Sequence, residues 1–175
     1  MQSCAPLSSF VDLSDLSDAG KQLIIAPNAH DREQLAAWAG VNAIDAFEAH
    51  IELGKLSPTR FSYRAQVNAD LVQTCVVTLE PVRSRLKFAF SRDLQLVRGM
   101  FDHSGERVTT EMGDDAAPEQ ITDSKYDIAV PVLEEFALAI DPYPRAPGVM
   151  FEPILEAEGQ ESNPFAVLKE LKNKH

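Results

Sequence analysis

The sequence has few of the residues that build a disulfide framework, a zinc centre or a glycine-rich loop. Its 175 residues include two cysteines, Cys4 and Cys75, eight glycines and four scattered histidines. Two cysteines in a chain of this length do not suggest a disulfide framework, so a reducing cytoplasm is the simplest expected compartment. Residues 1–20 contain neither a basic region nor a continuous apolar run, so we expect no secretory signal. No stretch approaches the ~20 apolar residues that span a bilayer.

The sequence also lacks the motifs of several common enzyme classes. It contains no phosphate-binding glycine loop, nucleophile elbow, zinc-protease helix or dinucleotide fingerprint. No histidine has a carboxylate or thiol at the spacing of a catalytic triad or a metal site. The carboxylates of Glu134 and Glu135 are adjacent, and neighbours on a helix point in different directions, which makes them poor candidates for paired acid and base catalysis. We therefore expect a protein that is not an enzyme.

What the sequence does have is an acidic composition with one basic region. The chain has 27 Asp and Glu against 16 Lys and Arg, for a formal net charge of −11. Residues 51–100 are the exception, because they hold eight of the cations and only four of the carboxylates. An acidic chain attracts basic partners at long range, whereas a local group of cations attracts phosphate or an acidic partner.

Residues 60–92 are predicted to form a β-hairpin, because apolar side chains occupy alternate positions in each of its two arms. In the first arm the odd positions are apolar: Phe61, Tyr63, Ala65, Val67, Ala69 and Leu71. In the second arm the even positions are apolar: Val82, Leu86, Phe88 and Phe90. The numbers of opposed residues in an antiparallel pair add to a constant, so this reversal requires an odd sum. We expect a two- or four-residue loop centred between Glu80 and Pro81, which places Leu71 opposite Phe90.

The polar face of this hairpin is rich in cations. Arg83, Arg85 and Lys87 alternate along the second arm, and Arg60 and Arg64 lie on the first. Alternate strand residues are about 6.6 to 7 Å apart, which roughly matches the spacing of phosphates in a nucleic-acid strand. These five residues are therefore candidates for RNA binding. The alternative is that they are solvated charges that protect the surface of the sheet.

The residues before the hairpin predict strands and one helix. Residues 8–26 favour two short strands around a turn. A helix is expected next, capped by Asn28 or Asp31 and ended by Gly40, with Trp38 in the core. Residues 41–54 favour a strand by their alternation, although the spacing of their larger apolar residues also permits a helix. That strand would place Glu48, His50 and Glu52 on one face, which we interpret as a solvated face rather than a metal site.

The second half of the chain predicts an acidic loop and two helices. Residues at about 102–123 are acidic and poor in large apolar groups, as is typical of a loop. Residues 127–140 predict a helix with Pro131 in its first turn. A linker then leads to a short C-terminal helix over residues 163–172. Its apolar stripe, which consists of Phe165, Leu168 and Leu171, either docks on the core or binds a partner.

Together these elements predict an α+β protein. We expect a curled antiparallel sheet built around the long hairpin, with two or three packed helices and the short C-terminal helix; a barrel-like closure of the sheet is left open. Residues 1–150 are expected to form a single domain, followed by a linker and helical motif over residues 151–175.

Three segments, taken in order, resemble the YceD family, the large ribosomal RNA subunit accumulation proteins, and are closest to its proteobacterial branch. They are residues 69–82 (ADLVQTCVVTLEPV), residues 127–145 with their final Asp-Pro-Tyr-Pro-Arg, and the terminal Asn-Pro-Phe-Ala-Val-Leu-x-x-Leu-Lys. The resemblance implies a bacterial cytosolic factor needed for the synthesis, processing or stability of the large-subunit (23S) ribosomal RNA. Contact with that RNA would be direct or indirect, and a basic large-subunit ribosomal protein is the alternative partner.

The resemblance also leads to a prediction about zinc binding. Many family members have Cys-x-x-Cys where this chain has Cys75-Val76-Val77-Thr78, and some have a second cysteine pair further on, which together resemble a four-thiolate zinc site. Here the second cysteine of the first pair is Thr78, and no later pair exists. Since a threonine hydroxyl cannot replace a thiolate in a structural zinc site, we predict that this chain has no metal and no other cofactor.

Overall fold

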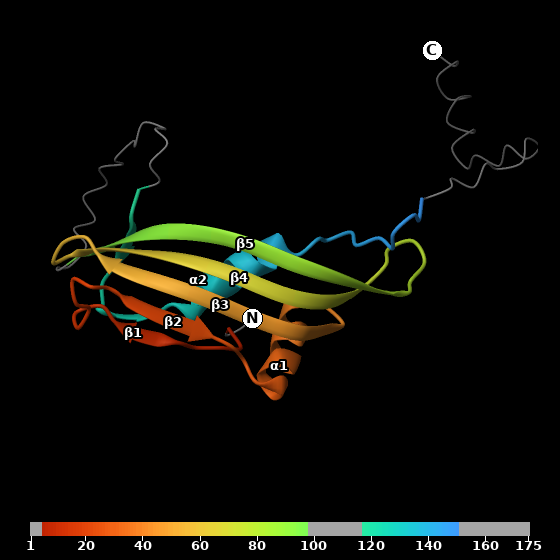
Figure 1. The fold of residues 1–175 in the computed structure, drawn as a ribbon, viewed down its shortest axis with the longest axis horizontal. Coiled ribbons are helices and arrows are strands. Elements are labelled where there is room, and N and C mark those ends of the chain that lie inside the picture. Colours follow the sequence, from red (N-terminus) through yellow and green to blue (C-terminus); the bar gives the residue numbers. More distant parts are fainter. Residues whose placement is uncertain (1–4, 98–116, 151–175) are drawn as a thin grey trace, which may run out of the picture.

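The computed structural model describes residues 5–97 and 117–150, which form two sheets and two helices. A five-stranded sheet has the order β2-β3-β4-β5-β6, and a two-stranded sheet pairs β1 with β7. The elements are β1 (Phe10–Asp12), β2 (Lys21–Ile25), α1 (Ala29–Ala39), β3 (Ala43–Lys55), β4 (Arg60–Thr74), β5 (Pro81–Leu96), β6 (Glu119–Ile121), β7 (Lys125–Asp127) and α2 (Ala129–Ala139). In Figure 1 the large sheet lies in front and α2 crosses behind it. The predicted α+β class is confirmed.

The long hairpin of β4 and β5 is the centre of the large sheet. As predicted, the numbers of its paired residues add to an odd sum. The pairing runs from Arg60 opposite Gln95 to Thr74 opposite Pro81, which gives an odd sum throughout. The odd positions of β4 from Phe61 to Leu71 are buried, and the even positions of β5 face the same side. The side that these residues face is called the inner face below, and the opposite side the outer face.

The predicted length and position of the hairpin loop were wrong. Six residues, 75–80, connect the strands, so Leu71 lies opposite Ser84 rather than Phe90. Pro81 is not part of the turn but the first residue of β5, a position where a strand tolerates the missing N–H of proline. The backbone amide of Leu79 donates to the Cys75 carbonyl at 3.0 Å, and Leu79 adopts a φ of 60°. The chain thus closes a wider turn than a two- or four-residue loop allows.

The sheet is mixed and open, which differs from the curled antiparallel sheet that was expected. β6 runs parallel to β5 along Leu94–Leu96, and a barrel-like closure is not confirmed. β6 also lies within the acidic loop predicted at about 102–123; the part of that loop before residue 117 lies outside the described residues. β1 and β2 exist as expected but do not pair with each other, because β1 pairs with β7 and β2 with β3.

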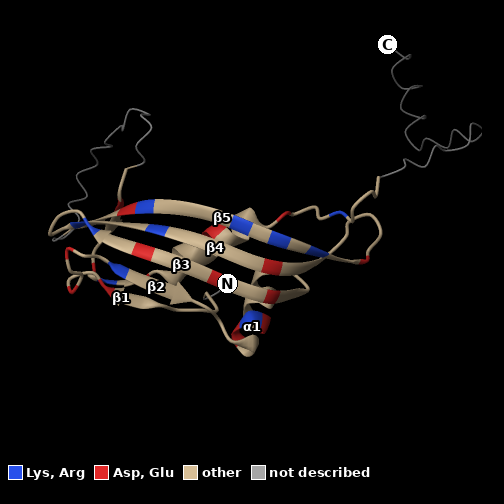
Figure 2. Cartoon of the chain, in the orientation of Figure 1, with Lys and Arg blue, Asp and Glu red and all other residues tan. Residues whose placement is uncertain are grey.

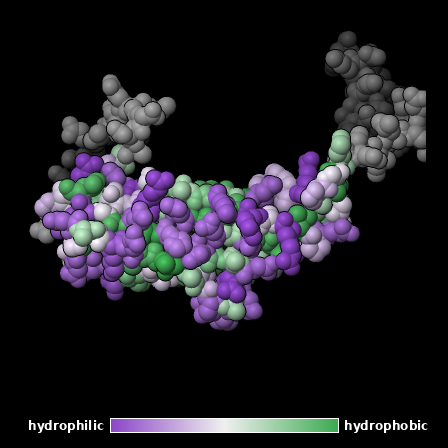
Figure 3. All heavy atoms as spheres, in the orientation of Figure 1, coloured by the Kyte–Doolittle hydropathy of each residue, from purple (hydrophilic) through white to green (hydrophobic). Residues whose placement is uncertain are grey.

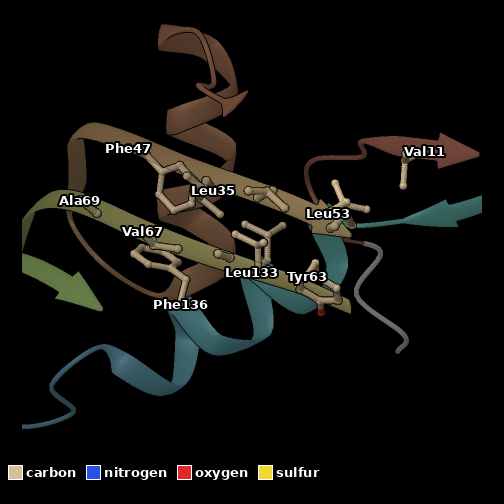
Figure 4. Close-up of a cluster of buried hydrophobic side chains, with 14 of the residues drawn as sticks. Val11, Leu35, Phe47, Leu53, Tyr63, Val67, Ala69, Leu133 and Phe136 are labelled. Carbon is tan, nitrogen blue, oxygen red and sulfur yellow. The ribbon is translucent and has the colours of Figure 1, made fainter. Parts of the chain in front are cut away.

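Both described helices pack on the inner face. The side chain of Asn28 accepts the amide of Asp31 at the start of α1, and Gly40 ends the helix with a φ of 70°. At the start of α2, a carboxylate oxygen of Asp127 accepts the amide of Ala129 at 3.2 Å. Phe136 of α2 meets Phe47 of β3 edge to face at 5.1 Å between ring centroids, inside the apolar cluster drawn in Figure 4. α2 therefore covers the inner face of the sheet over β3 and β4.

Two further expectations concern the helices. Trp38 is partly buried and packs against the core, as predicted. The C-terminal helix expected over residues 163–172 lies outside the described residues. Neither α1 nor α2 has the length and hydropathy that a bilayer-spanning helix requires.

Candidate functional site: the charged outer face of the sheet

The five cations proposed for RNA binding all lie on the outer face of the sheet. They occupy odd positions of β5 and even positions of β4, and all five are exposed: Arg83, Arg85, Lys87, Arg60 and Arg64. Figure 2 shows a row of blue bands, the colour of Lys and Arg, along the right half of β5. The sequence predicted that these five side chains share the polar face of the hairpin. The structure confirms this placement, because the strand alternation turns every one of them away from the core.

The strand register sets the spacing of these cations. Arg83, Arg85 and Lys87 alternate on β5 near the hairpin loop, and Lys87 lies opposite Asn68. Arg64 and then Arg60 follow on β4 at intervals of four residues, which is roughly 13 Å each along the strand. The outer face therefore has a group of three closely spaced cations near the hairpin loop and two more widely spaced cations beyond it.

Carboxylates from other strands of the sheet pair with three of these cations. The Arg85 guanidinium makes two hydrogen bonds to Asp70, at 2.6 and 3.3 Å, and thereby lowers the pKa of the Asp70 carboxyl. Arg83 approaches Asp45 at 3.2 Å, and a third pair joins Arg60 to Asp93 at 3.5 Å. Within residues 5–97 and 117–150, Lys87 and Arg64 make no such pair.

The outer face is consequently balanced in charge rather than basic. Five exposed or half-exposed carboxylates lie beside the five cations: Asp45, Glu48, Glu52, Asp70 and Asp93. Glu48 also approaches the ring of His50 at 3.1 Å, and both side chains are about half exposed. As predicted, Glu48, His50 and Glu52 form a solvated face. Any polyanion that binds here must compete with these carboxylates for the arginines.

An open groove of about 560 Å³ crosses this face from the start of α1 to β5. It is lined by Ala26, Pro27, Arg32, Asp45, Ala46, Phe47, Glu48, Asn68, Ala69, Asp70, Arg85 and Lys87. Figure 3 shows mostly hydrophilic side chains over this side of the sheet, with hydrophobic residues between them. The groove adds Arg32 to the cations that a ligand on this face would meet.

Cys75, the free cysteine among the described residues, has a buried thiol. Its sulfur accepts the backbone amides of Thr78 and Ala146, each at 3.4 Å. Hydrogen bonds from the side chain and backbone of Thr78, with those from Ala146 and Val77, lower the pKa of the Cys75 thiol to about 6. In the described part of the chain, no three histidine, cysteine, aspartate or glutamate side chains gather in an arrangement that could hold a metal ion.

A second charged cluster lies on the inner side of the sheet, and sequence reasoning missed it. Arg92 of β5 is within 2.8 Å of Glu135, 3.8 Å of Glu134 and 3.7 Å of Glu119. The hydrogen bond with Glu135 raises the pKa of the Arg92 guanidinium. Arg92 occupies an even position among apolar ones, which is the signal that would have placed it on the inner side.

The wrong loop length explains why the Asp70–Arg85 pair was also missed. The expected register would have placed Arg85 opposite Val76, whereas the observed register places it opposite Asp70. Opposed charges on a β-ladder interact directly, so a loop of the correct length would have predicted this pair.

Comparison with known proteins identifies a family. A family model described as "Large ribosomal RNA subunit accumulation protein YceD" matches residues 63–172, which include most of β4, all of β5 and α2. No curated protein and no solved structure matches the chain.

Proposed function

Because the chain belongs to the YceD family, we propose that it is a ribosome biogenesis factor that supports accumulation of the large-subunit (23S) ribosomal RNA without catalysing a reaction. The family match over residues 63–172 is the observation on which this proposal depends. The matched range includes most of β4 and all of β5, and with them four of the five outer-face cations; Arg60 precedes it.

The proposed contact is between the outer face and RNA phosphates. Lys87 and Arg64 supply two cations that make no ion pair among the described residues, and Arg83 and Arg85 supply two whose pairs are exposed. An exposed ion pair contributes only about 0–1 kcal/mol to stability, so a phosphate can displace Asp45 or Asp70 at little cost. The displaced carboxylates stay nearby and repel the RNA, which limits the affinity of this face.

A second candidate is a contact with a basic large-subunit ribosomal protein. The net charge of −11 and the exposed Glu48 and Glu52 favour it, because they attract a cationic partner. In this case the carboxylates of the outer face form the contact, and the arginines hold them in position.

Two matched variants distinguish the candidates. The first replaces Arg83, Arg85 and Lys87 by Ala, and the second replaces their pairing carboxylates with amides, Asp45→Asn and Asp70→Asn. Binding of each full-length variant to large-subunit RNA fragments is measured by electrophoretic mobility shift at several salt concentrations. If RNA is the ligand, the alanine variant binds more weakly, and its salt slope falls by about 0.7 to 0.9 per lost phosphate contact. The amide variant then binds RNA more tightly.

The opposite pair of results identifies a protein ligand. A basic partner loses affinity for the amide variant, which lacks two carboxylates, and gains affinity for the alanine variant. A pull-down from nuclease-treated lysate retains such a partner, whereas it loses one that RNA bridges. RNA affinity and salt slope that are unchanged in both variants would rule out this face as the RNA contact.

A further inference from the structure

The inner face of β5 is only half covered. Leu86, Phe88 and Phe90 face the core side, but each keeps an intermediate exposure, whereas their partners on β4 are buried. Phe88 and Phe90 stack at 6.4 Å between centroids with an interplanar angle of 22°. Among the described strands, β5 pairs on its free side only with β6, along Leu94–Leu96. An aromatic surface therefore lies beside a largely unpaired strand edge.

α2 contributes a further exposed apolar side chain next to this surface. Val132, Leu133 and Phe136 form the buried side of α2, whereas the side chains of Glu134 and Glu135 extend from another side of the helix to Arg92 of β5. Leu138 lies one turn further along the same side, and 80% of its surface is exposed. We call the surface of Leu86, Phe88, Phe90 and Leu138 the β5 shelf.

An acidic rim borders the β5 shelf. Glu119, Glu134 and Glu135 converge on the single guanidinium of Arg92, which itself lies 5.8 Å from the centroid of Phe90. Three carboxylates against one cation leave a net charge of about −2 at the rim. The shelf therefore suits an apolar segment that has its own cations.

We infer that residues 163–172 of this same chain dock on the β5 shelf. On a helix, Phe165, Leu168 and Leu171 form an apolar stripe, and Lys169 and Lys172 lie along the edge of that stripe. The stripe complements the aromatic surface of β5, and the two lysines complement the glutamates of the rim. This segment covers the apolar edge of the protein.

The intervening chain is long enough for this contact. Shortly before residue 150, where the described residues end, the chain lies beside the hairpin loop, since the Ala146 amide is 3.4 Å from the Cys75 sulfur. Phe88 is seven residues from the start of β5, or roughly 24 Å along the strand. Residues 151–162 can span up to roughly 40 Å when extended, so the segment reaches the shelf with chain to spare.

Zero-length carbodiimide coupling of the full-length protein tests this inference. The reagent joins a lysine to a carboxylate only where the two touch, and mass spectrometry of the monomer band locates each link. We expect links from Lys169 or Lys172 to Glu119, Glu134 or Glu135. We also expect about a tenfold loss of these links in Leu168→Asp, because the substitution places a charge in the apolar stripe.

Matched control variants separate docking from unfolding. Ala166→Asp adds the same charge to the opposite side of the segment and should leave the links unchanged. Leu138→Asp alters an exposed residue of the shelf and should remove the links, whereas Leu56→Asp, which alters an exposed residue between β3 and β4, should not. Links found only in the band of a cross-linked dimer would mean that residues 163–172 of a second copy dock on the shelf. That result, or the same links in Leu168→Asp as in Ala166→Asp, would overturn the inference.

Discussion

Replacing Phe136 tests whether α2 packs on the inner face of the sheet as the structure indicates. Its ring is fully buried and meets Phe47 edge to face at 5.1 Å. Replacing a buried Phe with Ala costs about 3–5 kcal/mol, from the lost burial and the cavity that remains. A domain has about 5–15 kcal/mol of stability in total, so Phe136→Ala should remove a large part of the free energy of unfolding. Urea denaturation followed by circular dichroism measures this loss.

A double-mutant cycle isolates the contact between the two rings. An aromatic pair contributes about 0.5–1.5 kcal/mol beyond its buried area, so Phe47→Ala and Phe136→Ala should together cost less than the sum of the single changes by about that amount. Ala137→Ser on the same helix is the control, and its cost should stay within about 0.5 kcal/mol because the side chain is exposed and lies outside the β5 shelf. Additive losses from the two Phe variants, or an Ala137→Ser loss as large as that of Phe136→Ala, would refute the placement of α2.

Two further predictions concern the hairpin loop and the start of α1. The lowered pKa of Cys75, about 6 against an ordinary value of 9.0, means that the folded protein holds the thiolate more strongly than the unfolded chain does. Its contribution to stability should therefore be absent below about pH 6, rise between pH 6 and 9, and be complete above that range. Denaturation of the wild type and Cys75→Val across this range measures it, and a stability difference that does not change with pH would contradict the assignment. Asn28→Ala removes the acceptor for the Asp31 amide and should cost about 1 kcal/mol in thermal denaturation, whereas Asn28→Ser should restore most of it.

Most of the large elements could be predicted from the sequence, because each has a strong local signal. The parity reversal between the two arms of the hairpin placed the five cations on one face, and the structure agrees. Asn28, one of the two caps that were expected, and Gly40 marked the ends of α1 through side-chain capping and a left-handed backbone conformation. In these cases the residues that determine the structure are close together in the sequence.

The features that were missed depend on contacts between distant segments. Pro81 indicated a turn nearby and was placed at its centre, but nothing local showed that residues 75–80 close a wide loop held by Pro144 and Ala146, more than 60 residues away. β6 has only three residues and forms because Leu94–Leu96 offers it a strand edge. The charge balance of the outer face likewise depends on the register, which the loop length sets.

The small β1–β7 sheet affects how the chain folds. The Ser9 amide donates to Asp127 at 2.7 Å across a separation of 118 residues, and Phe10 pairs with Asp127. Contacts between such distant residues close a long loop and slow folding, so we expect this sheet to form late, after the hairpin. Since Asp127 also accepts the first amide of α2, removing the first ten residues should loosen the helix at its start while the hairpin stays folded.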